Sequence, residues 1–196
     1  MRRSLVSIVF AALLVVRAAA YVAQTDAGLS GASEDRWVVQ HPYESKNPLK
    51  RVILLGSATV GTRSGKAVLI VGCHPDDGGV STVGVRLRDG GMGFDLDAFE
   101  GEDGAGTHRK LLTFALSDSP PIVRTVNGSG QEGNEFELDF EPSMPELRRL
   151  LSSASAGKPF ILTLHPPSGK GPVLVMHFQL PADNGALKIA ISPCLH

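Results

Sequence analysis

The chain has 196 residues and a formal net charge of −1, with 19 Lys+Arg against 20 Asp+Glu. This balance argues against a nucleic-acid-binding protein, which needs a concentrated basic face. Only two cysteines, Cys73 and Cys194, are present, so the chain is not a disulfide-rich scaffold.

The start of the chain has the order of a secretory signal peptide. Arg2 and Arg3 precede an apolar run from Leu5 to Val16, and small residues follow up to Ala20. The run is shorter than the roughly 20 residues that a membrane-spanning helix needs. We therefore predict a signal peptide at 1–20 and no membrane insertion after its cleavage. The mature protein is expected to be periplasmic or secreted, with a formal charge of about −4.

The remaining chain divides into a short tail and one domain. Residues 21–35 are polar and lack periodicity, which predicts a flexible N-terminal tail. A single β-rich domain is predicted at 36–196, because apolar or alternating segments separated by turn residues are typical of strands. The predicted strands cover residues 37–39, 52–60, 66–73, 80–88, 112–116, 136–140, 160–164 and 173–180.

One predicted strand has a very regular pattern. Phe136, Leu138 and Phe140 alternate with acidic residues. A period of two places the aromatic and aliphatic side chains on one face of a strand and the carboxylates on the other. This strand should therefore bury one face and hold its carboxylates in water.

A helix is predicted at about 143–156. Ser143 and Glu146 form a Ser-x-x-Glu capping box, leucines recur at helical spacing, and Gly157 is typical of a position just past a helix. Residues 186–194 fit either a helix face or a strand. About eight strands joined by short turns favour a mainly β fold, an antiparallel β-sandwich or barrel-like domain with one packed helix and a short C-terminal segment.

The two cysteines are expected to form a disulfide. Cys73 ends an apolar strand and Cys194 lies near the end of the sequence. Two such cysteines usually pair in an oxidising compartment. The bond would close a loop of about 120 residues, for which the chain-entropy model gives at most roughly 4 to 5 kcal/mol.

The residues His74-Pro75-Asp76-Asp77 resemble the signature of zinc-dependent deacetylases of the LmbE type. That resemblance implies zinc binding by His74 and Asp77, with Asp76 as the general base of an amide hydrolase. The segment at 80–88 alternates like a strand, however, and no His-x-x-His pair supplies a third ligand. We therefore favour a hairpin turn, with no catalytic residue and no cofactor, and keep the zinc hydrolase as the alternative.

Two further sequence features admit two interpretations. The acidic residues between Asp95 and Asp103 are a solvated loop or a weak cation site, since their spacing is not that of an EF-hand. Asn127 begins an Asn-Gly-Ser sequon, which matters only in a host that glycosylates exported proteins.

The order of parts along the domain resembles periplasmic accessory proteins of the VasI/TagO type, which are associated with type VI secretion. The matching pieces are Trp37, 69–73, 83–87, 146–151, 160–164, 177–180 and Cys194. The family's aromatic-arginine-aromatic-aspartate stretch has no match around 92–97. The resemblance implies an envelope protein that is not an enzyme.

These observations predict an exported, non-catalytic protein-binding module. It would act as an accessory or inhibitor, which the resemblance associates with secretion, and its partner would be another extracytoplasmic protein. A structural or carbohydrate-binding envelope domain is a further alternative, although one Trp and two Tyr offer few aromatic platforms for a sugar.

Overall fold

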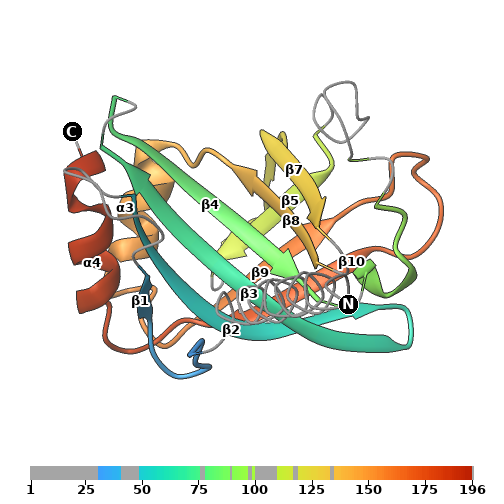
Figure 1. Ribbon diagram of the computed structural model, residues 1–196, viewed down its shortest axis with the longest axis horizontal. Helices are drawn as coiled ribbons and strands as arrows, with labels where there is room; N and C mark the ends of the chain where they lie inside the picture. The colour runs from blue at the N-terminus through green and yellow to red at the C-terminus, as the bar shows by residue number, and fades with distance from the viewer. Residues whose placement is uncertain are drawn as a thin grey trace, which may run out of the picture. The chain divides into compact units, whose positions relative to one another are not determined.

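A long antiparallel hairpin of β2 (Lys50–Val60) and β3 (Arg63–His74) forms the centre of the sheet in the computed structural model of the chain (Figure 1). Both strands are rich in β-branched and aliphatic residues, which pack well on a pleated surface. The turn between them is tighter than the gap at 61–65 that the predicted strands 52–60 and 66–73 leave. Pairing continues to Val60 opposite Arg63, and Gly61 adopts a left-handed φ of 58° that favours glycine.

The structure describes residues 31–40, 49–75, 78–88, 90–96, 99, 110–116, 119–132 and 135–195. Residues from Ala32 to His196 belong to one compact unit. The predicted signal peptide and residues 21–30 of the predicted tail lie outside the described residues. Ser33 and Glu34, which the sequence places in the tail, contact the domain. The amide of Leu55 donates to the Ser33 carbonyl at 2.8 Å, and Lys66 pairs with Glu34 at 2.6 Å.

The described residues contain ten strands in one antiparallel sheet. Nine follow the path β6-β5-β9-β10-β2-β3-β4-β8-β7, and β1 pairs beside β2. The remaining bounds are β1 Val38–Gln40, β4 Val80–Leu87, β5 Leu112–Leu116, β6 Ile122–Arg124, β7 Gly128–Glu132, β8 Glu135–Phe140, β9 Pro159–Leu164 and β10 Leu174–Gln179.

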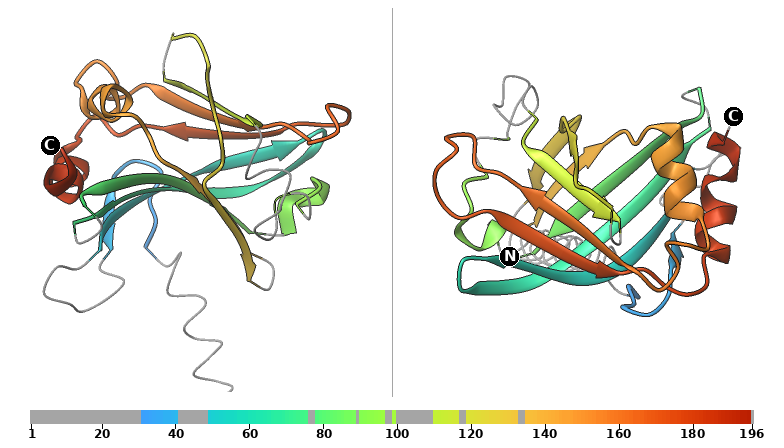
Figure 2. Two further views of the ribbon diagram at one scale, coloured as in Figure 1. Left: turned by 90° about the horizontal axis from the view of Figure 1, so that it is seen from above. Right: turned by 180° about the vertical axis from the view of Figure 1, so that it is seen from behind.

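The sheet curls into a half-barrel, so strands far apart along its path face each other across the interior. Figure 2 shows β9 and β10 forming one layer over β2, β3 and β4. Phe114 of β5 stacks on Phe140 of β8 with ring centroids 5.3 Å apart, and it also contacts Phe160 of β9. These rings lie in the buried core that the inward residues of both layers share. The predicted barrel-like β fold is confirmed.

The two edges of the sheet are joined by a very short connection. β6 and β7 lie at opposite ends of the strand path, yet only residues 125–127 separate them in sequence. Val126 is fully buried, and the amide of Asn127 donates to the Asp139 carbonyl at 2.8 Å. The chain therefore crosses directly from one layer of the half-barrel to the other.

Two strands, β6 and β7, were not predicted from the sequence. β6 has three residues, and β7 has the sequence Gly-Ser-Gly-Gln-Glu without any β-branched or aromatic side chain. Neither shows the alternation that identifies a strand. Their pairing with β5 and β8 supplies the strand conformation instead.

The predicted helix is present but shorter than expected. α3 spans Met144–Leu151, and the Glu146 carboxylate accepts from the Ser143 amide at 2.7 Å, as the capping box requires. The predicted end at 156 is wrong. The hydroxyls of Ser152 and Ser155 both donate to the Arg149 carbonyl at 2.7 Å. These hydroxyls take the place of the amide donors that a further helical turn would supply.

The C-terminal segment, which the pattern left undecided, is helical. α4 spans Gly185–Ile191 and is followed by a short 3-10 helix, η3, at Ser192–Cys194. Pro193 lies in the first turn of η3, where its missing amide hydrogen costs nothing. α4 packs at the end of the sheet formed by β1, β2 and β3 (Figure 1). No helix in the described part of the chain has the length and apolar character needed to span a membrane.

Candidate functional site

The predicted disulfide is confirmed. The Sγ atoms of Cys73 and Cys194 lie 2.10 Å apart, and 121 positions in sequence separate the two residues. Both cysteines are buried, and Cys194 also lies against the Val80 carbonyl. The bond ties η3 to the end of β3, so its position indicates a structural clamp.

Trp37 belongs to the same end of the domain. Its side chain is 5% exposed, and its indole Nε1 donates to Asn184 Oδ1 at 3.1 Å. Asn184 precedes α4, so this bond joins the start of the domain to its last helix. Trp37 is therefore a core residue and does not form a ligand platform.

The residues proposed for zinc lie at the turn after β3. His74 is the last residue of that strand, Pro75 follows in a turn, and β4 begins at Val80. Asp76 and Asp77 lie outside the described residues. The strand-turn-strand context of the motif is the one predicted for a hairpin. Within the described residues no group of three or more His, Cys, Asp or Glu could hold a metal ion, and the zinc alternative stays a prediction.

The acidic segment at 95–103 is described only in part. Asp95 is exposed between buried Phe94 and Leu96, and the acidic residues from 97 onward lie outside the described residues. Phe99 is fully buried and contacts Phe94 and Phe136 of the core. The acidic pattern of this segment indicated only its carboxylates; the buried rings of Phe94 and Phe99 were not predicted.

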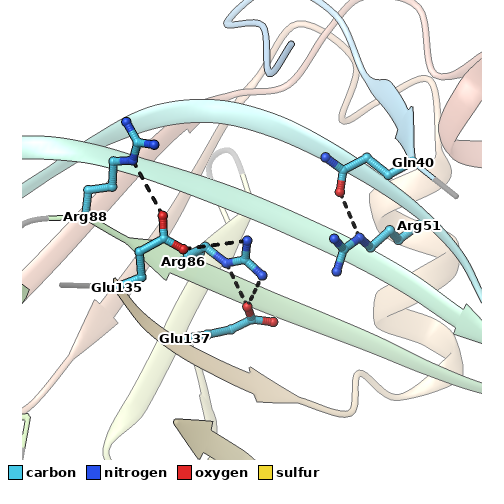
Figure 3. Close-up of polar contacts among 6 residues, drawn as sticks. All are labelled: Gln40, Arg51, Arg86, Arg88, Glu135 and Glu137. Carbon is cyan, nitrogen blue, oxygen red and sulfur yellow. Dashed lines mark hydrogen bonds and ion pairs between the residues drawn. The ribbon is translucent and has the colours of Figure 1, made fainter. Parts of the chain in front are cut away.

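The outer side of the half-barrel has two regions of opposite composition. The first, called here the β4–β8 outer face, carries charged side chains (Figure 3). It consists of the outward residues of the two strands and the residues that follow each of them, namely Thr82, Gly84, Arg86, Arg88, Glu135, Glu137, Asp139 and Glu141.

Ion pairs hold part of the β4–β8 outer face together. Arg86 donates from Nε and from its terminal nitrogen to Glu137 Oε2, at 2.8 and 2.5 Å. Glu135 lies 3.8 Å from Arg86 and 3.6 Å from Arg88. The predicted alternation of this strand is confirmed, but Glu135, Glu137 and Asp139 are half-buried, so the expectation of fully solvated carboxylates is wrong. Arg86 shields Glu137 from water, and Arg88 shields Glu135, in pairs that cross from β4 to β8.

Asp139 lies between two glycines on this face. Gly84 of β4 and Gly128 of β7 are its partners in register, and a methyl group at Gly128 would come within 2.8 Å of Asp139 Oδ2. Burial raises the pKa of the Asp139 carboxyl, and the nearby carboxylates of Glu137 and Glu141 raise it further. The folded protein therefore holds a proton on Asp139 more readily than the unfolded chain does.

At the far side of the central hairpin, β1 is fastened to β2 by a polar contact. Arg51 Nε donates to Gln40 Oε1 at 2.8 Å, and the two residues are partners in register (Figure 3). The contact therefore holds β1, the first strand of the described residues, against β2.

The second region, called here the β9–β10 outer face, has no charged side chain. It comprises the outward residues of β5, β9 and β10, the part of β2 that pairs with β10, and one residue of β6. These are Thr113, Ala115, Pro159, Ile161, Thr163, Val175, His177, Gln179, Ser57, Thr59 and Val123. Not one of these described positions is Asp, Glu, Lys or Arg.

The β9–β10 outer face is continuous across five strands. Val123, Thr113, Thr163, Val175 and Thr59 are successive partners in register, so β-branched side chains form one row from β6 to β2. Val123 is 44% exposed, and the other four are half-buried by their neighbours in the row. Such side chains have restricted rotamers, so the row forms a weakly apolar surface whose side chains change conformation little.

A signal for this surface is present in the sequence, although the surface was not predicted from it. The segments Leu112–Leu116, Pro159–Leu164 and Leu174–Gln179 have no charged residue at all.

Comparisons of the chain with protein-family models, with curated proteins and with solved structures find no match.

Proposed function

We propose that this protein is an exported, non-catalytic module that binds another extracytoplasmic protein through the β9–β10 outer face. The observation that carries the proposal is the segregation of charge between the two outer faces of one sheet. The partner surface is expected to be uncharged and weakly apolar as well, because a charged group placed against this face would lose water without gaining an ion pair.

Physical reasons favour this face over the other for binding. The buried centre of a protein interface is depleted of charged residues, because their desolvation is costly. Threonine, valine and isoleucine in a sheet lose little rotamer freedom on contact, which lowers the entropic cost of association. The β4–β8 outer face would have to give up the hydration of its ion pairs.

Export and an accessory role rest on sequence features. The signal peptide pattern and the resemblance to VasI/TagO-type proteins favour an envelope protein, and the disulfide between Cys73 and Cys194 is compatible with an oxidising compartment. The proposal does not depend on the identity of the secretion system, and an inhibitor of another envelope protein would use the same surface.

A matched pair of substitutions tests the proposal. Thr163→Arg places a charge at the centre of the β9–β10 outer face, and Thr82→Arg places the same charge on the β4–β8 outer face. Both threonines are half-buried strand residues that point outward. A photo-crosslinking residue at Val123 should capture a specific envelope protein, and capture should fall at least tenfold in Thr163→Arg while Thr82→Arg stays near wild type.

The site of capture provides the control. A crosslinker at Glu141, on the β4–β8 outer face, should not capture the same protein. Equal capture from Glu141 and Val123, or equal loss with both arginine variants, would contradict the assignment of the surface.

A further inference from the structure

We propose that one end of the domain docks on a bilayer that contains anionic phospholipid. This surface, called here the helix end, consists of the exposed side chains of residues 144–158 and 181–195, all of which the structure describes. These two stretches contain α3 and α4, which lie side by side at the same end of the sheet (Figures 1 and 2). The helix end is distinct from the β9–β10 outer face, so the inference goes beyond the function proposed above.

The helix end carries basic side chains that the fold does not use. Four of them are exposed, namely Arg148 and Arg149 in the last turn of α3, Lys158 before β9, and Lys188 on α4. None of these four has an ion-pair partner among the described residues. Arg124, by contrast, is paired with a carboxylate, as are the arginines of the β4–β8 outer face. The four cations are therefore available to a partner.

The carboxylates of the same stretches do not neutralise this charge. Glu146 is buried, and it bonds to Arg124 and to the Ser143 amide. Asp183 is exposed, and its carboxylate accepts from the Gly185 amide at 2.7 Å. The helix end thus has four exposed cations against one exposed carboxylate, although the whole chain has a net charge of −1. Such a local excess of positive charge complements an anionic surface.

An exposed isoleucine favours a lipid surface over other anionic partners. Ile189 follows Lys188 on α4, and at 69% it is the most exposed large apolar side chain of the described residues. The opposite side of α4 lies in the core, so Ile189 is directed away from it. At a membrane surface, cations bind the headgroup phosphates while a neighbouring apolar side chain enters the boundary with the acyl chains. An acidic polymer in water offers the charge but no apolar layer for Ile189.

The expected size of the effect follows from membrane electrostatics. Each Lys or Arg beside an anionic bilayer strengthens binding about fivefold. The double variant Arg148→Gln/Arg149→Gln should therefore weaken binding to anionic vesicles about 25-fold. Ile189→Ser should weaken it roughly tenfold, because its apolar side chain is no longer buried in the boundary layer.

The experiment is co-sedimentation of the purified mature protein with vesicles of phosphatidylcholine alone or mixed with phosphatidylglycerol. Wild type should bind the mixed vesicles and not the phosphatidylcholine vesicles, and about 0.5 M salt should release it. Two controls should bind like wild type. Lys170→Gln removes an exposed cation from the loop between β9 and β10, and Val123→Ser removes an exposed apolar side chain from the β9–β10 outer face.

The outcomes separate the lipid surface from its alternatives. Wild type that fails to bind the mixed vesicles, or binds both kinds equally, would overturn the proposal. Equal weakening by Lys170→Gln and by Arg148→Gln/Arg149→Gln would also overturn it. Binding to soluble polyglutamate as tight as to the vesicles, with no effect of Ile189→Ser, would assign the helix end to an acidic protein instead. The substituted side chains are exposed, so the Tm of each variant should equal that of wild type and confirm that it is folded.

Discussion

The β4–β8 and β9–β10 outer faces belong to the same sheet and cover the same core. The outward side chains of the first face are largely charged, whereas those of the second are uncharged. In β8, phenylalanine and leucine point inward while glutamate and aspartate point outward. In β9, the same inward pattern is combined with isoleucine and threonine on the outside. The inward residues of both strands lie in one shared core, so the difference between the two faces is confined to their outward residues.

The largest expected effect tests whether the two faces share one interior. Phe114→Ala, behind the β9–β10 outer face, and Phe140→Ala, behind the β4–β8 outer face, should each lower the free energy of unfolding by about 3–5 kcal/mol. Because the two rings stack, the double variant should lose about 0.5–1.5 kcal/mol less than the sum. Chemical denaturation measures this; strict additivity would mean that the layers do not pack together as described.

A smaller effect separates the faces by their response to salt. Arg86→Met keeps the aliphatic stem but removes the contacts with Glu137 and Glu135. We expect a loss of roughly 0.5–1 kcal/mol at low ionic strength, since the glutamate is partly exposed. The loss should shrink in about 1 M salt. Thr163→Val, on the β9–β10 outer face, should show no salt-dependent change, and a similar salt response in both variants would remove the electrostatic distinction between the faces.

The smallest expected effect concerns Asp139. Its pKa is raised in the folded state, so the folded protein binds a proton more readily than the unfolded chain does. The charged carboxyl therefore destabilises the fold above the folded-state pKa, and this cost disappears as pH falls below the ordinary aspartate pKa. Asp139→Asn should raise Tm at pH 7 and match wild type near pH 3. A lower Tm at pH 7 would show that the carboxylate is stabilising; Asp95→Asn, the same change at an exposed position, is the control.

Local sequence chemistry predicted the parts of the structure that depend on neighbouring residues. The capping box of Ser143 and Glu146 marked the start of α3, and alternation marked β8. The pairing of Cys73 with Cys194 followed from their number and from the predicted oxidising compartment. Each of these needs only a pattern or a count, which a single sequence provides.

Other parts depend on tertiary contacts and could not be read in the same way. β7 is a strand because it pairs with β8, and its own composition favours a turn. α3 ends early because Ser152 and Ser155 bond to Arg149. The β9–β10 outer face required the register of five strands before its uncharged residues could be placed side by side.

The direct connection between β6 and β7 has a consequence for how the sheet opens. The two edge strands of most sheets fray independently, because each is held by a single neighbour. Here both edges belong to one short stretch of chain anchored at the buried Val126. Detaching one edge should therefore loosen the other, so the amides of β6 and β7 are expected to exchange with solvent deuterium in a single correlated event.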